Sequence, residues 1–432
     1  MKRTAIKKLT GIILAFTFIA FNYSPFVQNI SDFPSELQIF EGETQILDFK
    51  LPLKLSIEGE DVNVLKFNGN SLKDQESYSM KAPLSIEPQG QGDISLSFKL
   101  LGLIPIKQIK VSVTSQKSLI PGGNSIGVSL YTKGALVVGT SEVTDRSGNA
   151  HFPAMEAGLM PGDVIESVNG VAVKDANHLS QLVNKAQGRR VDLECRRDNR
   201  LFVTTIEPVK DANDDKYRLG IWVRDSTAGV GTLTFYDPQT RYFGALGHAI
   251  TDVDTGSLLS VKGGEIMQSQ IMDIKIGKKG LPGELVGNFS GNRKVLGSII
   301  KNTAFGIYGK MSRSLPDFYL DKAIPIANRH NVKPGKASIL TTIDDRGIQE
   351  YDIEIIKVNQ QAVPSSKGLV IKITDPELLE KTGGIVQGMS GSPILQDGRI
   401  VGAVTHVFVN DPQKGYGIYI EWMLDEANKI IE

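Results

Sequence analysis

A serine flanked by glycines lies near the carboxyl end of this 432-residue chain, where residues 388–393 read G-M-S-G-S-P. Glycine at 388 and 391 permits backbone turns that a Cβ would forbid. Such a tight turn can direct the N–H groups of Gly388 and Ser390 at one point, as an oxyanion hole requires. A hairpin is predicted directly downstream, over 394–409. We therefore expect Ser390 to be an exposed nucleophile, with an ordinary Gly/Ser-rich turn between strands as the alternative.

A histidine that could activate this serine lies in residues 242–256, Y-F-G-A-L-G-H-A-I-T-D-V-D-T-G. Gly247 and Ala249 are small enough to let His248 come close to another segment. A serine hydroxyl is a weak nucleophile until an imidazole takes its proton, so the two segments predict a nucleophile and base pair. A buried, hydrogen-bonded core histidine is the structural alternative.

The amino-acid composition argues against a nucleic-acid surface, an intramolecular disulfide and a metal site. Lysine plus arginine equals aspartate plus glutamate, 48 of each, so no basic surface for nucleic acid is expected. The single cysteine, Cys195, excludes an intramolecular disulfide. Five histidines and one cysteine show no metal-ligand spacing. We expect no metal site and no cofactor.

The amino terminus has the pattern of a signal anchor. Residues 1–31 contain Lys2, Arg3, Lys7 and Lys8 but no acidic residue, and an apolar run follows at 9–21. Thirteen residues suit a signal h-region better than a full membrane span, and no small-x-small cleavage site follows. The positive flank would stay in the cytoplasm. We predict an uncleaved or slowly cleaved anchor over 1–24 and an exported remainder; the alternative is a buried core helix.

Two smaller domains are predicted before the serine region. Residues 32–116 alternate short apolar runs with turn signals, which indicates a small all-β domain. Residues 118–208 contain A-G-L-M-P-G-D-V-I at 157–165 and an apolar helical face further on. They resemble a PDZ domain. Its peptide-binding groove is expected along a free strand edge at Ile126, Gly127 and Val128, where a peptide or a carboxyl terminus would add as a strand. Docking within the chain is the alternative use of the groove.

The region 217–432 must place His248 and Ser390 together. It is rich in glycine and in short strands, with a helix expected near 421–431. Its length suits a peptidase built from two β-barrels, with His248 from the first and Ser390 from the second. The active site would then lie in the cleft between the barrels. The fold class predicted for the whole chain is mainly β.

These motifs together resemble a known family. The serine loop is similar to the G-x-S-G-x-P nucleophile loop of chymotrypsin-like serine peptidases. Together with G-H-A-I at 247–250, the amino-terminal membrane segment and the PDZ-like region, it resembles the stage IV sporulation protein B peptidases of endospore-forming bacteria. The resemblance covers most of the chain and implies a Ser-His-Asp serine endopeptidase.

The third member of such a triad is open. A base needs an acceptor behind its Nδ1–H to fix the tautomer. Asp375 matches the family's acidic residue shortly before the serine, but it could instead cap a short helix beginning at Pro376. The carboxylates considered are those of Asp252, Asp254, Asp273, Asp344, Asp345 and Asp375. The first two lie too near His248 along the chain to reach behind its ring easily. His406, on the strand after the hairpin, could line a specificity pocket or be structural.

The resemblance also implies a biological setting. Family members act in the space between forespore and mother cell, cleaving a membrane-bound regulator of an intramembrane metalloprotease that activates a late sigma factor. They also cut themselves free of their anchor. The rival interpretation is a membrane-tethered PDZ scaffold whose peptidase fold has lost activity. The presence of both His248 and Ser390 argues against that rival.

Overall fold

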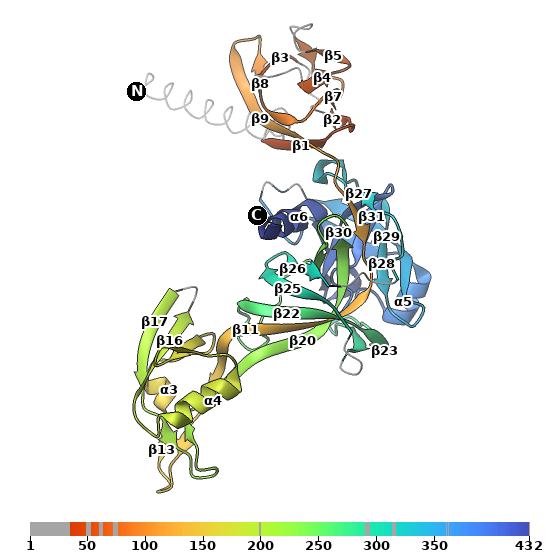
Figure 1. The fold of residues 1–432 in the computed structure, drawn as a ribbon. Helices are drawn as coiled ribbons and strands as arrows, with labels where there is room; N and C mark the ends of the chain where they lie inside the picture. Colours follow the sequence, from red (N-terminus) through yellow and green to blue (C-terminus); the bar gives the residue numbers. More distant parts are fainter. Residues whose placement is uncertain are drawn as a thin grey trace, which may run out of the picture. The chain divides into compact units, whose positions relative to one another are not determined.

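The computed structural model describes residues 35–48, 53–59, 64–71, 77–197, 200–289, 294–312, 317–359, 361 and 363–431. Two compact units emerge: one comprises residues up to 117 with 328–332 and 360–364, and the other holds the remainder (Figure 1). No helix within these described ranges is long and apolar enough to cross a membrane. The anchor predicted over 1–24 lies outside the described residues.

The amino-terminal unit is a pair of β-sheets around one core. The strand order is β1-β9-β8-β3-β6 in the first sheet and β2-β7-β4-β5 in the second. Alternate residues point inward, so that Leu37, Phe67, Leu84 and Phe98 join a single buried cluster. Its strands are β1 Glu36–Phe40, β2 Gln45–Leu47, β3 Lys54–Gly59, β4 Leu65–Phe67, β5 Asn70–Ser71, β6 Tyr78–Ser79, β7 Leu84–Pro88, β8 Gly92–Leu100 and β9 Ile104–Thr114. The short 3-10 helix η3, Arg329–Asn331, falls in the same unit.

The PDZ region has a core of its own within the second unit. Helix α4 begins after Asp175, whose carboxylate accepts from the His178 N–H at 2.7 Å, and it buries Leu179 and Val183 as the apolar face predicts. The elements of this region are β12 Val143–Thr144, β13 Ala150–His151, α3 Pro153–Glu156, β14 Val164–Val168, β15 Val171–Ala172, α4 Ala176–Lys185, β16 Val191–Arg197, β17 Arg200–Ile206, β18 Val209–Lys210 and β19 Tyr217–Arg218.

The peptidase region contains two rings of six strands. In the first ring, β11 pairs with both β20 and β22, and β25, β26 and β21 complete the circuit. The second ring is the closed barrel β28-β29-β30-β33-β32-β31. Strands of the first half are β10 Ser118–Pro121, β11 Ser125–Thr140, β20 Ile221–Tyr236, β21 Tyr242–Ala245, β22 Val261–Gln268, β23 Gln270–Lys275, β24 Glu284–Asn288, β25 Val295–Thr303 and β26 Gly306–Met311. The second half has β27 Ile324–Pro325, β28 Gly335–Thr342, β29 Ile348–Val358, β30 Leu369–Ile373, α5 Pro376–Thr382, β31 Pro393–Gln396, β32 Arg399–Phe408, β33 Asp411–Tyr419 and α6 Ile420–Ile431.

Two long strands run through both the PDZ region and the first ring. The carboxyl-terminal half of β11 pairs with the beginning of β20, and the amino-terminal half of β11 pairs with the middle of β20. Residues 125–131, which the sequence pattern assigned to the PDZ region, therefore lie in the first ring. These two strands are the part of the fold that connects the PDZ region to the catalytic region (Figure 1).

The prediction of a peptide-binding groove at Ile126, Gly127 and Val128 is wrong. Each of these residues pairs with β20 on one side and with β22 on the other, so no edge is left for a peptide strand. Ile126 and Val128 are also buried in the core of the first ring. In the loop before this strand, the N–H groups of Gly122 and Gly123 donate to backbone carbonyls of β20, so they are not available to bind the carboxylate of a peptide terminus.

Candidate active site

The serine loop follows α5 and ends where β31 begins. Gly388 and Gly391 have φ of +98° and +97°, in the left-handed region that glycine occupies without strain. A Cβ on Gly391 would lie 2.1 Å from the carbonyl oxygen of Thr232, so only glycine lets the loop approach β20 this closely. The Gly391 N–H donates to the Val404 carbonyl at 2.7 Å, which fixes the loop to β32 as well.

Thr232 on β20 holds the serine loop at two points. Its N–H donates to the Ser390 carbonyl at 3.0 Å, and its Oγ1 donates to the Gly388 carbonyl at 2.7 Å. Within the described part of the chain, the N–H groups of Gly388 and Ser390 have no protein acceptor. The loop thus has its carbonyls bound and the two predicted oxyanion donors available.

The hydroxyl of Ser390 is half-buried and points at β32. Its Oγ donates to the carbonyl of Thr405 at 2.7 Å. Among the described residues, no hydrogen bond joins Ser390 to His248. The hydroxyl must therefore turn from the Thr405 carbonyl to the imidazole before it can lose its proton, a side-chain rotation of the kind that takes picoseconds to nanoseconds where it is unhindered.

His248 reaches the same stretch of β32 from the first ring. It follows Gly247, whose φ is +70° and whose absent Cβ would lie 3.0 Å from Thr405 Cγ2. The centroid of its ring is 5.1 Å from that of His406, the residue after Thr405. Ser390 and His248 therefore contact consecutive residues of one strand, which brings the predicted nucleophile and base into one site.

The electrostatic state of His248 suits a general base. Burial lowers its pKa below 6.5, and the hydrogen bond of Nδ1 to the Ala249 carbonyl, 2.8 Å long, opposes part of that shift. A neutral imidazole that donates from Nδ1 keeps its lone pair on Nε2, where it can accept a proton. Desolvation, with His248 and Lys367 nearby, lowers the pKa of His406 to about 4. Both rings are consequently uncharged near pH 7.

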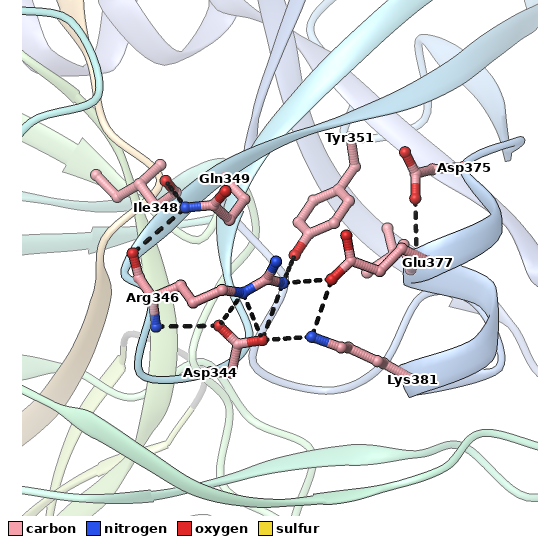
Figure 2. Close-up of polar contacts among 9 residues, drawn as sticks. Asp344, Arg346, Ile348, Gln349, Tyr351, Asp375, Glu377 and Lys381 are labelled. Carbon is pink, nitrogen blue, oxygen red and sulfur yellow. Dashed lines mark hydrogen bonds and ion pairs between the residues drawn. The ribbon is translucent and has the colours of Figure 1, made fainter.

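Asp375 makes no hydrogen bond to His248 within the described residues, so its role as the orienting acid stays a prediction. Its carboxylate accepts from the Leu378 N–H at 2.9 Å as the N-cap of α5, with Pro376 at the first helical position. Figure 2 shows Asp375 at the start of this helix, with its hydrogen bond directed into the helix. The helix-capping alternative describes this geometry, because an extended residue followed by proline favours a cap.

Three of the other candidate carboxylates also have different partners. Asp252 forms an ion pair with Arg224 and accepts from the Thr255 N–H, and Asp254 pairs with the same arginine. Asp344 joins Arg346 and Lys381 in the network that Figure 2 shows beside α5. None of the six aspartates considered is hydrogen-bonded to His248 in the described structure. The acceptor that orients the ring here is the backbone carbonyl of Ala249.

Two positioning residues escaped the sequence patterns. In the sequence, Thr232 is one threonine among others in a β-rich segment. Its role becomes visible only when its strand is placed against the serine loop. Arg224 binds Asp252, whose side chain is fully buried and organises the turn four residues after His248. Both act through strand β20, and neither lies near a recognisable motif.

A cavity of about 430 Å³ lies between α4 and the beginning of β20. Leu179 and Val183 line it from the helix, Ile221 and Trp222 line it from β20, and Leu219 lines it from the turn just before β20. The first residues of β20 pair with β11 along one edge of the strand, and the cavity lies between β20 and helix α4. Helix, strand and an apolar lining are the parts of a peptide-binding groove. The sequence signal that was overlooked is L-G-I at 219–221, just before a strand and after a polar turn.

Comparison with known families agrees with this geometry. Residues 215–424 match the model of SpoIVB peptidase S55, and residues 144–197 match a PDZ domain model. The region 215–424 belongs to the SpoIVB peptidase S55 family. It is therefore a serine endopeptidase domain, and Ser390 and His248 both lie within it. The S55 match also starts before β20, so that β20 belongs to the family's region.

A curated relative and two solved structures share parts of this chain. A protein named as putative zinc metalloprotease LL2128 of Lactococcus lactis subsp. lactis is 32% identical over 110 residues. That match covers 25% of this chain and 24% of the relative, so the chain spans about a quarter of the relative's length. Among the described residues, no group of three or more His, Cys, Asp or Glu side chains is arranged to hold a metal ion.

The solved structures resemble the chain weakly. The active form of the Rv3671c protease from M. tuberculosis is 12% identical, with a TM-score of 0.28, over 47% of this chain and 74% of that one. A structure titled GrC is 10% identical, with a TM-score of 0.29, over 48% of this chain and 88% of that one.

Replacing Thr232 by valine tests the role of this residue in positioning the serine loop. The Oγ1 bond to the Gly388 carbonyl is lost while the volume is kept, and we expect kcat to fall by about tenfold or more, a change of about 1.4 kcal/mol. Thr234→Val is the matched control: Thr234 lies two residues along β20, is buried, and has an Oγ1 without a partner among the described residues. The control should keep kcat and be neutral or stabilising. Equal kcat in both variants would contradict the positioning role.

Two substitutions of Asp375 distinguish a helix-capping role from a catalytic role. Asparagine caps a helix about as well as aspartate, so Asp375→Asn should leave kcat/KM within about threefold, whereas Asp375→Ala should lower the free energy of unfolding by about 0.5–2 kcal/mol. Thermal unfolding and peptide turnover of both variants would be measured side by side. A loss of about 10⁴ in kcat for the asparagine variant, as for a triad aspartate, would restore the orienting role.

The pH profile tests the state of His248. The base must be neutral to accept the serine proton, and because burial lowers its pKa, the neutral form persists below pH 6.5. The acid limb of kcat/KM should therefore fall at a pH lower than 6.5, with a plateau through pH 7. The measurement is kcat/KM between pH 4 and 8, with the stability of the fold monitored at each pH. An acid limb above pH 6.5 would show that the imidazole is exposed or paired with a carboxylate.

Proposed function

We propose that the whole chain is an exported, membrane-anchored serine endopeptidase of sporulation signalling. The observation that carries the catalytic part is the convergence of Ser390 and His248 on Thr405 and His406 of β32, beside two amide donors that have no acceptor among the described residues. An imidazole, a hydroxyl and an anion site at one place are what acyl transfer requires.

In the proposed mechanism, the Ser390 hydroxyl turns from the Thr405 carbonyl toward His248. Nε2 takes its proton as Oγ attacks the carbonyl carbon of the scissile peptide bond. The N–H groups of Gly388 and Ser390 donate to the oxyanion that forms. His248 then gives its proton to the leaving amine, and a water molecule hydrolyses the acyl-enzyme by the same sequence of proton transfers.

The proposed substrate is a membrane-bound regulatory protein that controls an intramembrane metalloprotease, in the space between forespore and mother cell. Cleavage would lead to activation of a late sigma factor. Membership of residues 215–424 in the SpoIVB peptidase S55 family supports this setting, and the cationic and apolar pattern of residues 1–24 supports the anchor. Self-cleavage after residue 25 would release the enzyme from the membrane.

The cavity between α4 and β20 is the proposed site for a peptide or a carboxyl terminus, in place of the groove predicted at residues 126–128. Its apolar lining by Leu179, Val183 and Ile221 suits an aliphatic side chain of such a ligand. The positive φ of Gly220, +67°, places a turn at the end of the groove. A bound segment would extend the sheet along β20.

A non-catalytic scaffold is the second candidate. The observation in its favour is that Ser390 donates to Thr405 instead of His248, and that among the described residues no carboxylate is hydrogen-bonded to the imidazole. In that case the PDZ groove would carry the whole function, and the serine loop would be a structural connection between barrels.

Ser390→Ala distinguishes the two candidates. Turnover of a peptide substrate and self-processing should fall by roughly 10⁴–10⁶-fold, because only the amide donors and binding remain. A labelled fluorophosphonate should modify the native chain at Ser390 and leave the alanine variant unmodified. Ser392→Ala, in the same loop, is the control and should keep the label. Unchanged processing in Ser390→Ala, with no labelling of the native chain, would favour the scaffold.

A further inference from the structure

The tip of the β8–β9 hairpin exposes three large aliphatic side chains. Leu101, Leu103 and Ile104 are 81%, 82% and 56% exposed. Elsewhere on this hairpin the aliphatic residues alternate inward, so that Leu96, Phe98 and similar side chains fill the core. Scattered exposed leucines are common, but three at one turn form an apolar patch of the kind that marks an interaction surface.

The backbone conformation of this turn does not favour a leucine at position 101. Leu101 and Gly102 have φ of +54° and +73°, and the Leu103 N–H donates to the Leu100 carbonyl at 3.1 Å. Two successive positive φ values are typical of a type I′ hairpin turn, which favours Asn-Gly or Asp-Gly. A leucine there adds backbone strain and also leaves its side chain in water. Neither feature helps the hairpin fold, so a function outside the fold explains both.

Basic residues accompany the tip. Lys99 precedes it, Lys107 and Lys110 follow it on β9, and residues 94–114 contain no acidic side chain. Lys99 pairs with Glu58, whereas Lys107 and Lys110 make no ion pair with any described residue. An apolar tip with lysines set back from it complements an anionic bilayer, where the aliphatic side chains enter the acyl boundary and the ammonium groups remain among the headgroups.

We propose that this hairpin tip inserts into the surface of an anionic lipid bilayer and forms a second membrane contact of the amino-terminal unit. A convex turn fits a deformable lipid surface better than the recess that a protein partner would have to provide. The sequence of the same unit begins with the apolar run 9–21, which is predicted to place it at a membrane. The contact goes beyond the proposed peptidase activity and does not depend on it.

The experiment uses the full-length chain with one introduced cysteine. The natural Cys195 is fully buried, and burial raises its thiol pKa to about 12, so it will not react with a maleimide. Leu103→Cys is labelled with an environment-sensitive fluorophore, and the protein is reconstituted with phosphatidylglycerol vesicles. Ile46→Cys, a 61% exposed site in the other sheet of the unit, is the matched control. Because each label reports only its own surroundings, insertion of residues 1–24 does not affect the comparison.

The label at 103 should shift to the blue and be quenched by lipid-borne quenchers, while the label at 46 stays in water. In a second variant, Leu101→Asn is added to Leu103→Cys. Asparagine suits the positive φ of this position, so the fold should be preserved, and the ratio of inserted to free tips should fall by about tenfold. Lys107→Gln should lower this ratio about fivefold in phosphatidylglycerol and leave it unchanged in phosphatidylcholine. Aqueous emission at 103 in both lipids, or a ratio insensitive to Leu101→Asn, would overturn the proposal.

Discussion

The active site depends on the contact between Thr232 of β20 and the serine loop. A loop with two glycines in left-handed conformations has little stability of its own, since glycine loses the most conformational freedom on ordering. Thr232 binds the carbonyls of Gly388 and Ser390, and Val404 binds the N–H of Gly391. These bonds fix peptide planes on both sides of Ser390, while the N–H groups of Gly388 and Ser390 have no acceptor in the part of the chain that the structure describes. Such an anion site costs little reorganisation when charge develops, which is the condition for electrostatic catalysis.

Ser390 and His248, the proposed catalytic pair, lie in one site but are not hydrogen-bonded to each other among the described residues. Ser390 donates to Thr405, and His248 donates to Ala249, so that each side chain satisfies its donor with a backbone carbonyl. Burial lowers the pKa of the imidazole, which keeps it neutral near pH 7, and activation of the site requires the hydroxyl to leave the Thr405 carbonyl for Nε2. In this arrangement the neutral backbone carbonyl of Ala249 occupies the position that a carboxylate holds in a Ser-His-Asp triad. It fixes the tautomer but offers less stabilisation to an imidazolium.

Strand β20 connects the functional parts of the second unit. Its first residues line the PDZ cavity, Arg224 binds the buried Asp252 beyond His248, and Thr232 holds the serine loop. A strand of 16 residues, paired with β11 through most of its length, is a stiff element. The groove, the turn after the base and the nucleophile therefore share one backbone segment, although they are far apart in sequence.

The sequence by itself determined the local features of the protein. Glycine at 388 and 391, the Asp375-Pro376 start of a helix and the apolar face of α4 are set by steric and periodic rules that act over a few residues. These patterns sufficed to predict a mainly β chain with a PDZ region, and they single out Ser390 and His248 as candidates that the structure brings to one strand. Only the tertiary structure decided which strand edges are free, because pairing partners lie about a hundred residues away. For this reason the sequence could not show that residues 126–128 are paired on both sides. The proposed groove lies at β20 instead, and Asp375 caps a helix. Thr232 became recognisable only once its strand met the serine loop.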